Sequence, residues 1–303
     1  MANVKTHKIK TVRTPSEWVL DILKVVFLAT VVVVTVYPFW NIFIISINDA
    51  TDAIRGGIYF LPRKLSFNSY QEILGRQTFL DSIKVSLART VVGTPVAVLV
   101  TSMLAFSLSR RDLVGRKFWN ILFVFTMYFG GGLVPYYMVL KNIHLLDTFW
   151  VFIFPMAMSV YNMILVRSYI DSMPDELFEA AKIDGANDLV VYFKMILPLS
   201  KPILMTVGLF VAISQWNSWF DAYLYTSSQS LKPMQSILVE ILNQYQTGAT
   251  TSAQMSNAKA GFTVTPDSIR MAATMVATIP IIMVYPFIQK YFVKGIMLGA
   301  VKA

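Results

Sequence analysis

The stretch FEAAKIDGANDLVVYFKMILPLSKP, residues 178–202, separates two long apolar runs. It opens with acidic residues, contains one glycine, Gly185, and ends with the prolines Pro198 and Pro202. Acidic residues, a lone glycine and terminal prolines are boundary signals of helices. The stretch is therefore predicted to be helical. The apolar runs on either side of it indicate whether the protein is soluble or lies in a membrane.

The first half of this segment is predicted to be a short helix. Pro174 suits a first helical turn, and the acids Asp175, Glu176 and Glu179 complement the positive end of a helix dipole. Small alanines in the middle of one face would let another surface approach closely. The residues that follow a spacing of three to four are Leu177, Ala180, Ala181 and Asp184.

The second half is predicted to be another helix. Gly185 is expected to end the first helix as a left-handed cap, and Asn187 or Asp188 to cap LVVYFKMIL, residues 189–197. The two prolines then end it and lead into the next apolar run. Two readings remain open: the pair docks against a cytoplasmic partner, or it lies on the membrane face as an amphipathic hairpin.

Composition places the chain in a bilayer. Of its 303 residues, 55% are hydrophobic and 14% are charged, whereas soluble domains are nearer a quarter charged. There is no cysteine, which excludes disulfides and thiolate metal sites. The predicted fold class is an all-α integral membrane protein. Six runs are long enough to cross: Val25–Ile47, Val91–Leu108, Phe118–Leu140, Thr148–Val166, Ile203–Phe220 and Met271–Ile288.

Two details of these spans are open to test. The second could begin near Ile83 if Lys84 and Arg89 snorkel or face protein. Gly130–Gly132 lie inside the third, where packing through small residues is favoured over an opened turn beside a pathway. The first span is expected to be uncleaved, because its apolar run is too long for a signal peptide.

Basic residues orient the chain. Most of the 26 lysines and arginines fall on one side if the N-terminus is cytoplasmic, and the short loop SRRDLVGRK, residues 109–117, is the clearest case. Topology thus accounts for the net charge of +9, and nucleic-acid binding is not needed to explain it. Both termini are predicted to be cytoplasmic. The organisation is a cytoplasmic segment 1–24, a membrane domain 25–292 with a cytoplasmic loop 169–201 and an extracellular loop 221–270, and a cytoplasmic tail 293–303.

No catalytic or metal-binding residues are predicted. The two histidines, His7 and His144, lie on opposite sides of the membrane in this topology, and no phosphate loop, nucleophile elbow or zinc motif is present. The chain is therefore not expected to be an enzyme or to bind a cofactor. If it depends on ATP, another chain must bind the nucleotide.

The quoted segment resembles a family signature. Glu179-Ala180-Ala181, three residues, Gly185, and later Ile196-Leu197-Pro198 are similar to the E-A-A-x-x-x-G…I-x-L-P pattern of ABC importer membrane subunits, and Asp184 and Ala186 extend the match. Met195 precedes the Ile-Leu-Pro element, a small departure. Carbohydrate-uptake permeases, above all Gram-positive permeases for complex carbohydrates, share three further stretches: YPF at 37–39, GGGLVPYYMVL at 130–140 and YPFIQKYFVKGIMLGAVK at 285–302.

The resemblance implies a type I ABC importer permease fold in a bacterial plasma membrane. It implies four partners besides the bilayer: a homologous second permease, an ATPase dimer that binds ATP and Mg²⁺, an extracellular solute-binding lipoprotein and an oligosaccharide. Residues Glu179–Gly185 would form the coupling helix, with Glu179 as polar contact, Ala180 and Ala181 in the ATPase cleft and Gly185 setting the turn. Asp184, Ala186 and Pro198 complete this set.

A substrate path is predicted at the end of the fifth span. In SQWNSWFDAY, residues 214–223, two amides could bind sugar hydroxyls and three aromatic rings could stack on sugar faces; alternatively these rings form an interfacial belt. The residues are Gln215, Asn217, Trp216, Trp219 and Phe220, and Tyr128 in the third span has the same two interpretations. In the polar outer loop, the resemblance implies that Thr247, Gly248, Gln254 and Gly261 contact the binding protein, although composition alone fits a flexible loop equally well.

Other functions are weighed against this one. An ABC permease for a peptide or amino acid would share the coupling loop but not the carbohydrate-type tail. A stand-alone secondary transporter would be expected to carry an ionisable residue in mid-membrane and inverted repeats, neither of which is evident in the sequence.

Overall fold

The computed structural model describes residues 15–247 and 264–300, with side chains described through residue 243 and from 264 to 286. These residues are helical apart from connecting segments and one bridge between Asn48 and Leu65. The elements are α1 Pro15–Ser46, α2 Ala50–Ala53, α3 Asn68–Leu74, α4 Gln77–Ser109, α5 Arg116–Tyr128, α6 Leu133–Asn142, η1 Phe149–Phe152, α7 Val160–Ile170, α8 Asp175–Ile183, α9 Asp188–Val191, η2 Tyr192–Ile196, α10 Leu197–Leu199, α11 Lys201–Asn217, α12 Phe220–Tyr225, η3 Gln229–Leu231, α13 Met234–Thr247 and α15 Pro266–Ala300.

Three helices are long and apolar enough to cross a bilayer: α1, α4 and α15 up to Pro286. Two bent pairs raise the number to five if each is one crossing. These are α5 with α6, bent by 115°, and residues 188–199 with α11, bent by 81°. The all-helical membrane class is confirmed. The number of candidate crossings among the described residues is three to five, where six were predicted.

The predicted third span is not one helix. α5 ends at Tyr128, α6 begins at Leu133, and the glycine run joins them. A Cβ added to Gly130 or Gly131 would meet no atom within 4 Å, and Gly132 has a φ of +86°. The interpretation of these glycines as close-packing residues is therefore wrong. They form an open turn, because glycine alone adopts this backbone readily and offers no side chain to hold the helix together.

Three other predicted spans also differ from the observed helices. The expected helix over Thr148–Val166 is replaced by the short η1, turns, and α7, which begins only at Val160. α4 starts at Gln77, before Val91 and also before the alternative start near Ile83. The condition set for the earlier start holds for Arg89, which is fully buried against protein. The fifth span ends at Asn217, and Phe220 already belongs to α12.

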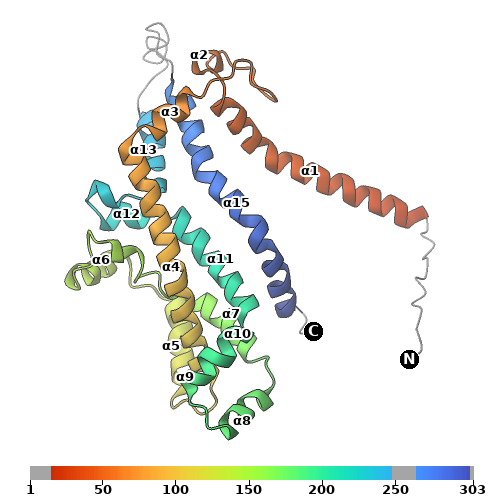
Figure 1. Ribbon diagram of the computed structural model, residues 1–303, viewed down its shortest axis with the longest axis vertical. Helices are drawn as coiled ribbons and strands as arrows, with labels where there is room; N and C mark the ends of the chain where they lie inside the picture. The colour runs from red at the N-terminus through yellow and green to blue at the C-terminus, as the bar shows by residue number, and fades with distance from the viewer. Residues whose placement is uncertain (1–14, 248–263, 301–303) are drawn as a thin grey trace.

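The core is built around α4, which packs against α11 and α7 (Figure 1). Small side chains on α4 allow this, because they let helix backbones approach without a large side chain between them. Ala97 and Ala105 are buried there, and Ser102 hydrogen-bonds Tyr192 across the interface at 2.6 Å. The cluster of buried apolar residues beneath it joins α4, α7, η2 and α11.

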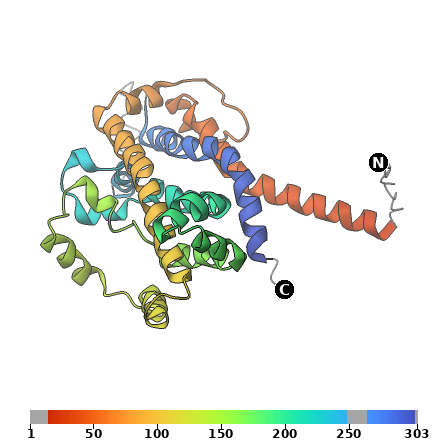
Figure 2. The same ribbon diagram turned by 60° about the horizontal axis from the view of Figure 1, so that its bottom comes forward.

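Helix α1 leaves this body. It packs against α15 and extends away from the other helices in two views (Figures 1 and 2). Its apolar side chains from Val25 to Val36 are largely exposed, with values of 41–68% for the large ones. In water such a helix would be unstable, so its surroundings must be lipid or another apolar surface.

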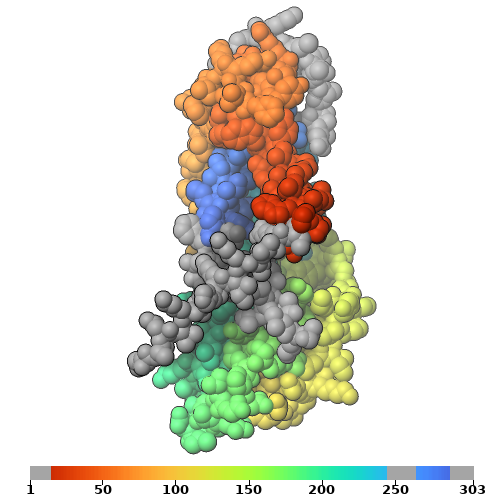
Figure 3. Space-filling view, turned by 90° about the vertical axis from the view of Figure 1, so that its right-hand side faces the viewer, coloured from red at the N-terminus to blue at the C-terminus, as the bar shows by residue number. Residues whose placement is uncertain are grey.

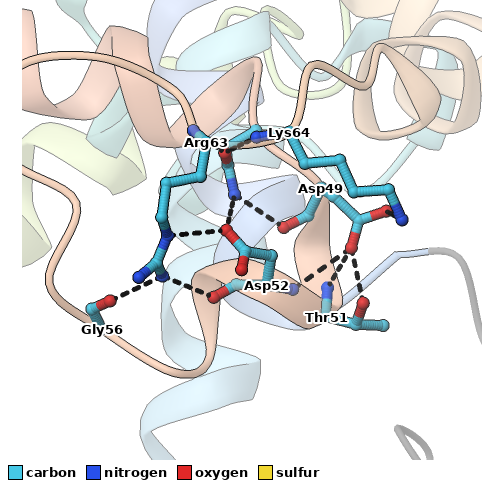
Figure 4. Close-up of polar contacts among 7 residues, drawn as sticks. Asp49, Thr51, Asp52, Gly56, Arg63 and Lys64 are labelled. Atoms are coloured by element: carbon cyan, nitrogen blue, oxygen red, sulfur yellow. Dashed lines mark hydrogen bonds and ion pairs between the residues drawn. The ribbon is translucent and has the colours of Figure 1, made fainter.

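A polar clasp fixes the chain where α1 ends (Figure 4). Asp49 caps α2 by accepting hydrogen bonds from the Thr51 and Asp52 backbone N–H groups, both at 3.1 Å. Arg63 binds the Asp52 carboxylate at 3.0 Å and the Gly56 carbonyl oxygen at 2.7 Å. The hydrogen bond from the Thr51 hydroxyl lowers the pKa of Asp49 below its ordinary value. The clasp holds the connection between α1 and α3.

Candidate functional site

Helix α8 lies at one end of the molecule (Figures 1 and 3). Pro174 occupies its N-cap position rather than the first turn, and Asp175 and Glu176 begin the helix. Phe178 and Ala181, three residues apart, pack against the core, whereas Glu179 and Ala180 are exposed. The outward face also carries apolar residues: Leu177 is 38% and Ile183 is 86% exposed. The helix therefore presents a mixed acidic and apolar face away from its own protein.

The turn after α8 has the predicted form. Gly185 adopts a φ of +71°, in open space, directly after the C-cap residue Asp184. The Ala186 N–H returns to the Ala181 carbonyl oxygen at 3.0 Å. The Asn187 side chain accepts a hydrogen bond from the Val190 N–H at 2.9 Å, which confirms its capping role.

The second helical stretch extends further than predicted. Residues 188–199 are continuous, with a π-helical segment, η2, that ends at Ile196, two residues before Pro198. The helix was expected to end at Pro198, but it ends at Leu199. The wider π turn fits the proline, which has no N–H to donate and whose ring crowds the carbonyl of the preceding turn. The 81° bend into α11 follows at Ser200.

Ion pairs join α8 to the loop at the end of α4. Arg111 binds Asp175 at 2.8 Å, and Lys182 lies 3.8 Å from Asp112. Arg110, only 14% exposed, binds Asp188 at 3.1 Å. A backbone hydrogen bond within its own residue, then the nearby Arg110 charge, lower the pKa of Asp112. A cavity of about 330 Å³ separates loop and helix. Thus α8 and the start of α9 are connected to the loop after α4 by charges, and Phe178 connects α8 to the apolar core.

The predicted path residues at the far end of α11 divide into two groups. Gln215 and Trp216 are 1% and 6% exposed. Their polar atoms bind within the chain: Gln215 Nε2 donates to the Phe152 carbonyl oxygen at 3.1 Å, and Trp216 Nε1 donates to that of Ala277 at 3.1 Å. The exposed group is Asn217, Trp219 and Phe220. Tyr128, at the end of α5, is 82% exposed.

The residue that the sequence reading did not assign to a site is Arg89. It is fully buried on α4 and binds Asp221, which follows the fifth apolar run, at 2.5 Å. An arginine beside a long apolar run was a feature of the sequence that could have indicated a site. Its partner could not be predicted, because Asp221 lies 132 positions away. The predicted contact loop is not placed: Gly248, Gln254 and Gly261 lie outside the described residues, and of Thr247 only the backbone, at the end of α13, is described.

The sequence of this chain is similar to those of known transport proteins. Residues 71–298 match the model of the family described as binding-protein-dependent transport system inner membrane component. The polygalacturonan/rhamnogalacturonan transport system permease protein YtcP of Bacillus subtilis (strain 168) is 38% identical over 282 residues, which are 93% of this chain and 98% of that protein. Protein LplC of the same organism is 37% identical over 306 residues and the full length of both.

A solved structure is also similar. It is a chain of a bacterial ABC transporter involved in the import of the acidic polysaccharide alginate. The two superpose with a TM-score of 0.84 at 29% identity, covering 92% of this chain and 99% of that one.

Proposed function

Because this chain belongs to the family of binding-protein-dependent transport system inner membrane components, we propose that it is one of two permeases of an ATP-driven oligosaccharide importer. As the multi-pass membrane component, it is not itself the catalytic subunit, and its transporter includes an ATPase and a binding protein. The oligosaccharide cargo is supported by the carbohydrates in the names of YtcP and of the alginate transporter.

The observation that carries this proposal is the outward face of α8. A short, capped helix with exposed Glu179, Ala180 and Leu177 is suited to docking in a cleft of an ATPase subunit. Its inward residues Phe178 and Ala181 connect it to the core, so a push on the helix would be transmitted to α4, α7 and α11. Asp184, Gly185, Ala186 and Pro198 shape the turn and the helix behind it. ATP and Mg²⁺ would be bound by the partner.

We further propose six crossings with both termini in the cytoplasm of a bacterial cell. The fourth would be built from η1, the following turns and α7, shielded by neighbouring helices rather than exposed to lipid as one continuous helix. Irregular backbone at membrane depth is tolerated where protein surrounds it, and Val151, Phe152 and Ile153 are all buried.

The second permease would pack against α1. This helix extends from the body with its apolar residues exposed, and a homologous subunit offers the apolar surface that fits it (Figure 2). A path shared between two such subunits also makes physical sense, because one chain with a core filled by α4 and α11 encloses little space of its own.

The substrate path would run past the exposed residues after α11. Trp219 and Phe220 offer ring faces, and Asn217 offers an amide. Gln215 and Trp216 would support this path from behind, and Tyr128 would line it from α5. The outer loop with Thr247, Gly248, Gln254 and Gly261 would contact a solute-binding lipoprotein. Four basic residues near the outer side would suit either an acidic sugar or acidic patches on the binding protein, of which we favour the second: Arg55, Arg63, Lys64 and Arg76. Arg63, Lys64 and Arg76 are each paired with a carboxylate of this chain, and the charge of Arg55 acts on Asp52.

The proposal is tested by the ATPase activity of the reconstituted transporter. Activity is measured with the binding protein empty or loaded with candidate oligosaccharides, for the wild type, Glu179→Lys and the control Glu72→Lys, which makes the same charge change at an exposed position on α3. We expect stimulation by one loaded sugar, lost in Glu179→Lys and kept in Glu72→Lys. Stimulation by a loaded peptide or amino acid, or a rate that ignores the binding protein, would refute the sugar importer. Full stimulation in Glu179→Lys would refute the role of α8.

A further inference from the structure

Arg89 is the largest fully buried side chain of the described residues, and it touches three separate parts of the chain. Its Nε donates to Gln215 Oε1 on α11 at 3.0 Å. Its guanidinium carbon lies 4.5 Å from the centre of the Phe152 ring in η1. One guanidinium N–H donates to the Ser218 carbonyl oxygen at 3.3 Å, at the point where α11 ends. A charged side chain buried beside an apolar run is costly and usually has a specific function.

Asp221 completes this arrangement. Its carboxylate accepts from both terminal nitrogens of Arg89, at 2.5 and 3.3 Å, which is the two-pronged geometry that a planar guanidinium favours. The same carboxylate accepts from the Ser218 hydroxyl and from the Ala222 N–H, each at 2.9 Å. Arg89 therefore determines where the first turn of α12 lies relative to α4 and α11.

α12 needs such support because it has only six residues, Phe220–Tyr225. Helices this short are not stable on their own and take their orientation from tertiary contacts. Its other end is held by Asp147, whose N–H donates to the Tyr225 carbonyl oxygen at 2.8 Å and whose carboxylate binds Ser227 and Ser228. α12 is thus fixed at its start by Arg89 and at its end by Asp147.

An exposed aromatic cluster lies on the helix that these contacts hold. Trp219, Phe220 and Tyr223 are 37%, 48% and 73% exposed, with ring centres 5.5–6.4 Å apart. The Phe220 and Tyr223 rings are inclined by only 20°. Such a surface of ring faces suits the apolar C–H face of a sugar, provided that the rings are held in place.

We propose that Arg89, through Asp221, is a positioning residue for the sugar: it holds the Trp219, Phe220 and Tyr223 cluster in the orientation that receives the ring during import. This inference rests on the proposed function and adds a determinant that touches no substrate itself. Arg89 has no exposed surface, so its effect passes through α12. The guanidinium is required rather than a charge alone, because it reaches Gln215, Ser218 and Asp221 at once.

The test uses the complete reconstituted transporter in vesicles and measures the sugar molecules imported per ATP hydrolysed. This ratio does not depend on how much complex assembles, so a purely structural role of Arg89 would leave it unchanged. For Arg89→Lys we expect a fall of about 3- to 10-fold, the range for losing an aromatic contact, with stimulated ATP hydrolysis retained. The control is Lys84→Met on the same helix, whose side chain is 70% exposed, and it should leave the ratio unchanged.

A second comparison links Arg89 to the rings. Tyr223→Ala should lower the ratio in the wild type but much less in Arg89→Lys, because the cluster is already displaced. If Arg89→Lys does not assemble, Ser218→Ala takes its place, since it removes only the hydroxyl bond to Asp221. A fall of at least about 2-fold is expected, because a hydrogen bond to a carboxylate is stronger than a neutral one.

An unchanged ratio in the assembled Arg89 or Ser218 variant, or equal losses from Tyr223→Ala in both backgrounds, would overturn the inference. Both outcomes presuppose a wild type that imports sugar, so they are distinct from failure of the proposed function, in which the wild type would import none.

Discussion

Replacing Gly93 on α4, even by alanine, is predicted to destabilise the folded protein. A Cβ at this position would lie 2.7 Å from Gln215 Nε2, 3.0 Å from Gln215 Cδ and 3.3 Å from Ile153 Cδ1. The Gln215 amide has little freedom to move, because it binds Arg89 on one side and the Phe152 carbonyl on the other. Gly93→Ala should therefore displace Gln215 from both partners.

The size of the effect follows from those two bonds. A hydrogen bond to a charged group contributes about 1.5–3 kcal/mol and a neutral one about 0.5–1.5 kcal/mol. Replacing glycine by alanine inside a helix by itself stabilises the helix by about 1 kcal/mol, which offsets part of this loss. The net destabilisation is therefore about 1–3.5 kcal/mol, which corresponds to a Tm lower by about 2–14 °C at about 2–4 °C per kcal/mol.

The assay is thermal unfolding of the purified transporter in detergent, followed by tryptophan fluorescence at one fixed scan rate. Gly208→Ala on α11 is the matched control, because its new Cβ would meet Val98 Cγ2 at 3.5 Å, an ordinary contact. Its Tm should equal or slightly exceed that of the wild type. Shortening the partner, as in Gly93→Ala with Gln215→Asn, should cost less than the two single changes added. A Gly93→Ala protein as stable as Gly208→Ala would refute the reasoning.

Three further outcomes are expected. Gly185→Ala should weaken sugar-stimulated ATP hydrolysis, because an alanine at this positive φ costs about 1 kcal/mol of backbone strain. Gly185→Asn should weaken it less, because asparagine tolerates a positive φ. Wild-type activity in both variants would contradict this. The Thr51 hydrogen bond lowers the pKa of Asp49, so the Asp49 carboxylate stabilises the folded state fully above the ordinary aspartate pKa. This stabilisation is lost as the pH falls through the lowered pKa of Asp49 in the folded state. The Tm measured from about pH 6 to about 3 should therefore drop less steeply in Asp49→Asn. Trp216→Phe, which removes the bond to the Ala277 carbonyl, should lower the Tm by the equivalent of about 1 kcal/mol, and an unchanged Tm would show that this bond contributes nothing.

Residues 175–199, α8 to α10, show how much of the local structure can be predicted from neighbouring residues. Acidic residues at their start, a glycine in the left-handed region and a capping asparagine are short-range features, and each was predicted at its observed place. The exception is the helix end at Pro198, since a π turn accommodates the proline and carries the helix one residue further. Which face of α8 is turned outward required the structure, because Ala180 and Ala181 look alike in sequence and only one is exposed.

The sequence by itself determined the membrane environment, the helical class and the local form of residues 175–199, because composition, apolar run length and capping are properties of neighbouring residues. Only the tertiary structure decided where the apolar runs bend and which polar groups are buried together. Run length records how apolar a segment is and not the direction of its axis, so the 115° turn at the glycines was not predicted. The pairing of Arg89 with Asp221 joins residues 132 positions apart, and such a contact exists only because α4 and α11 pack side by side.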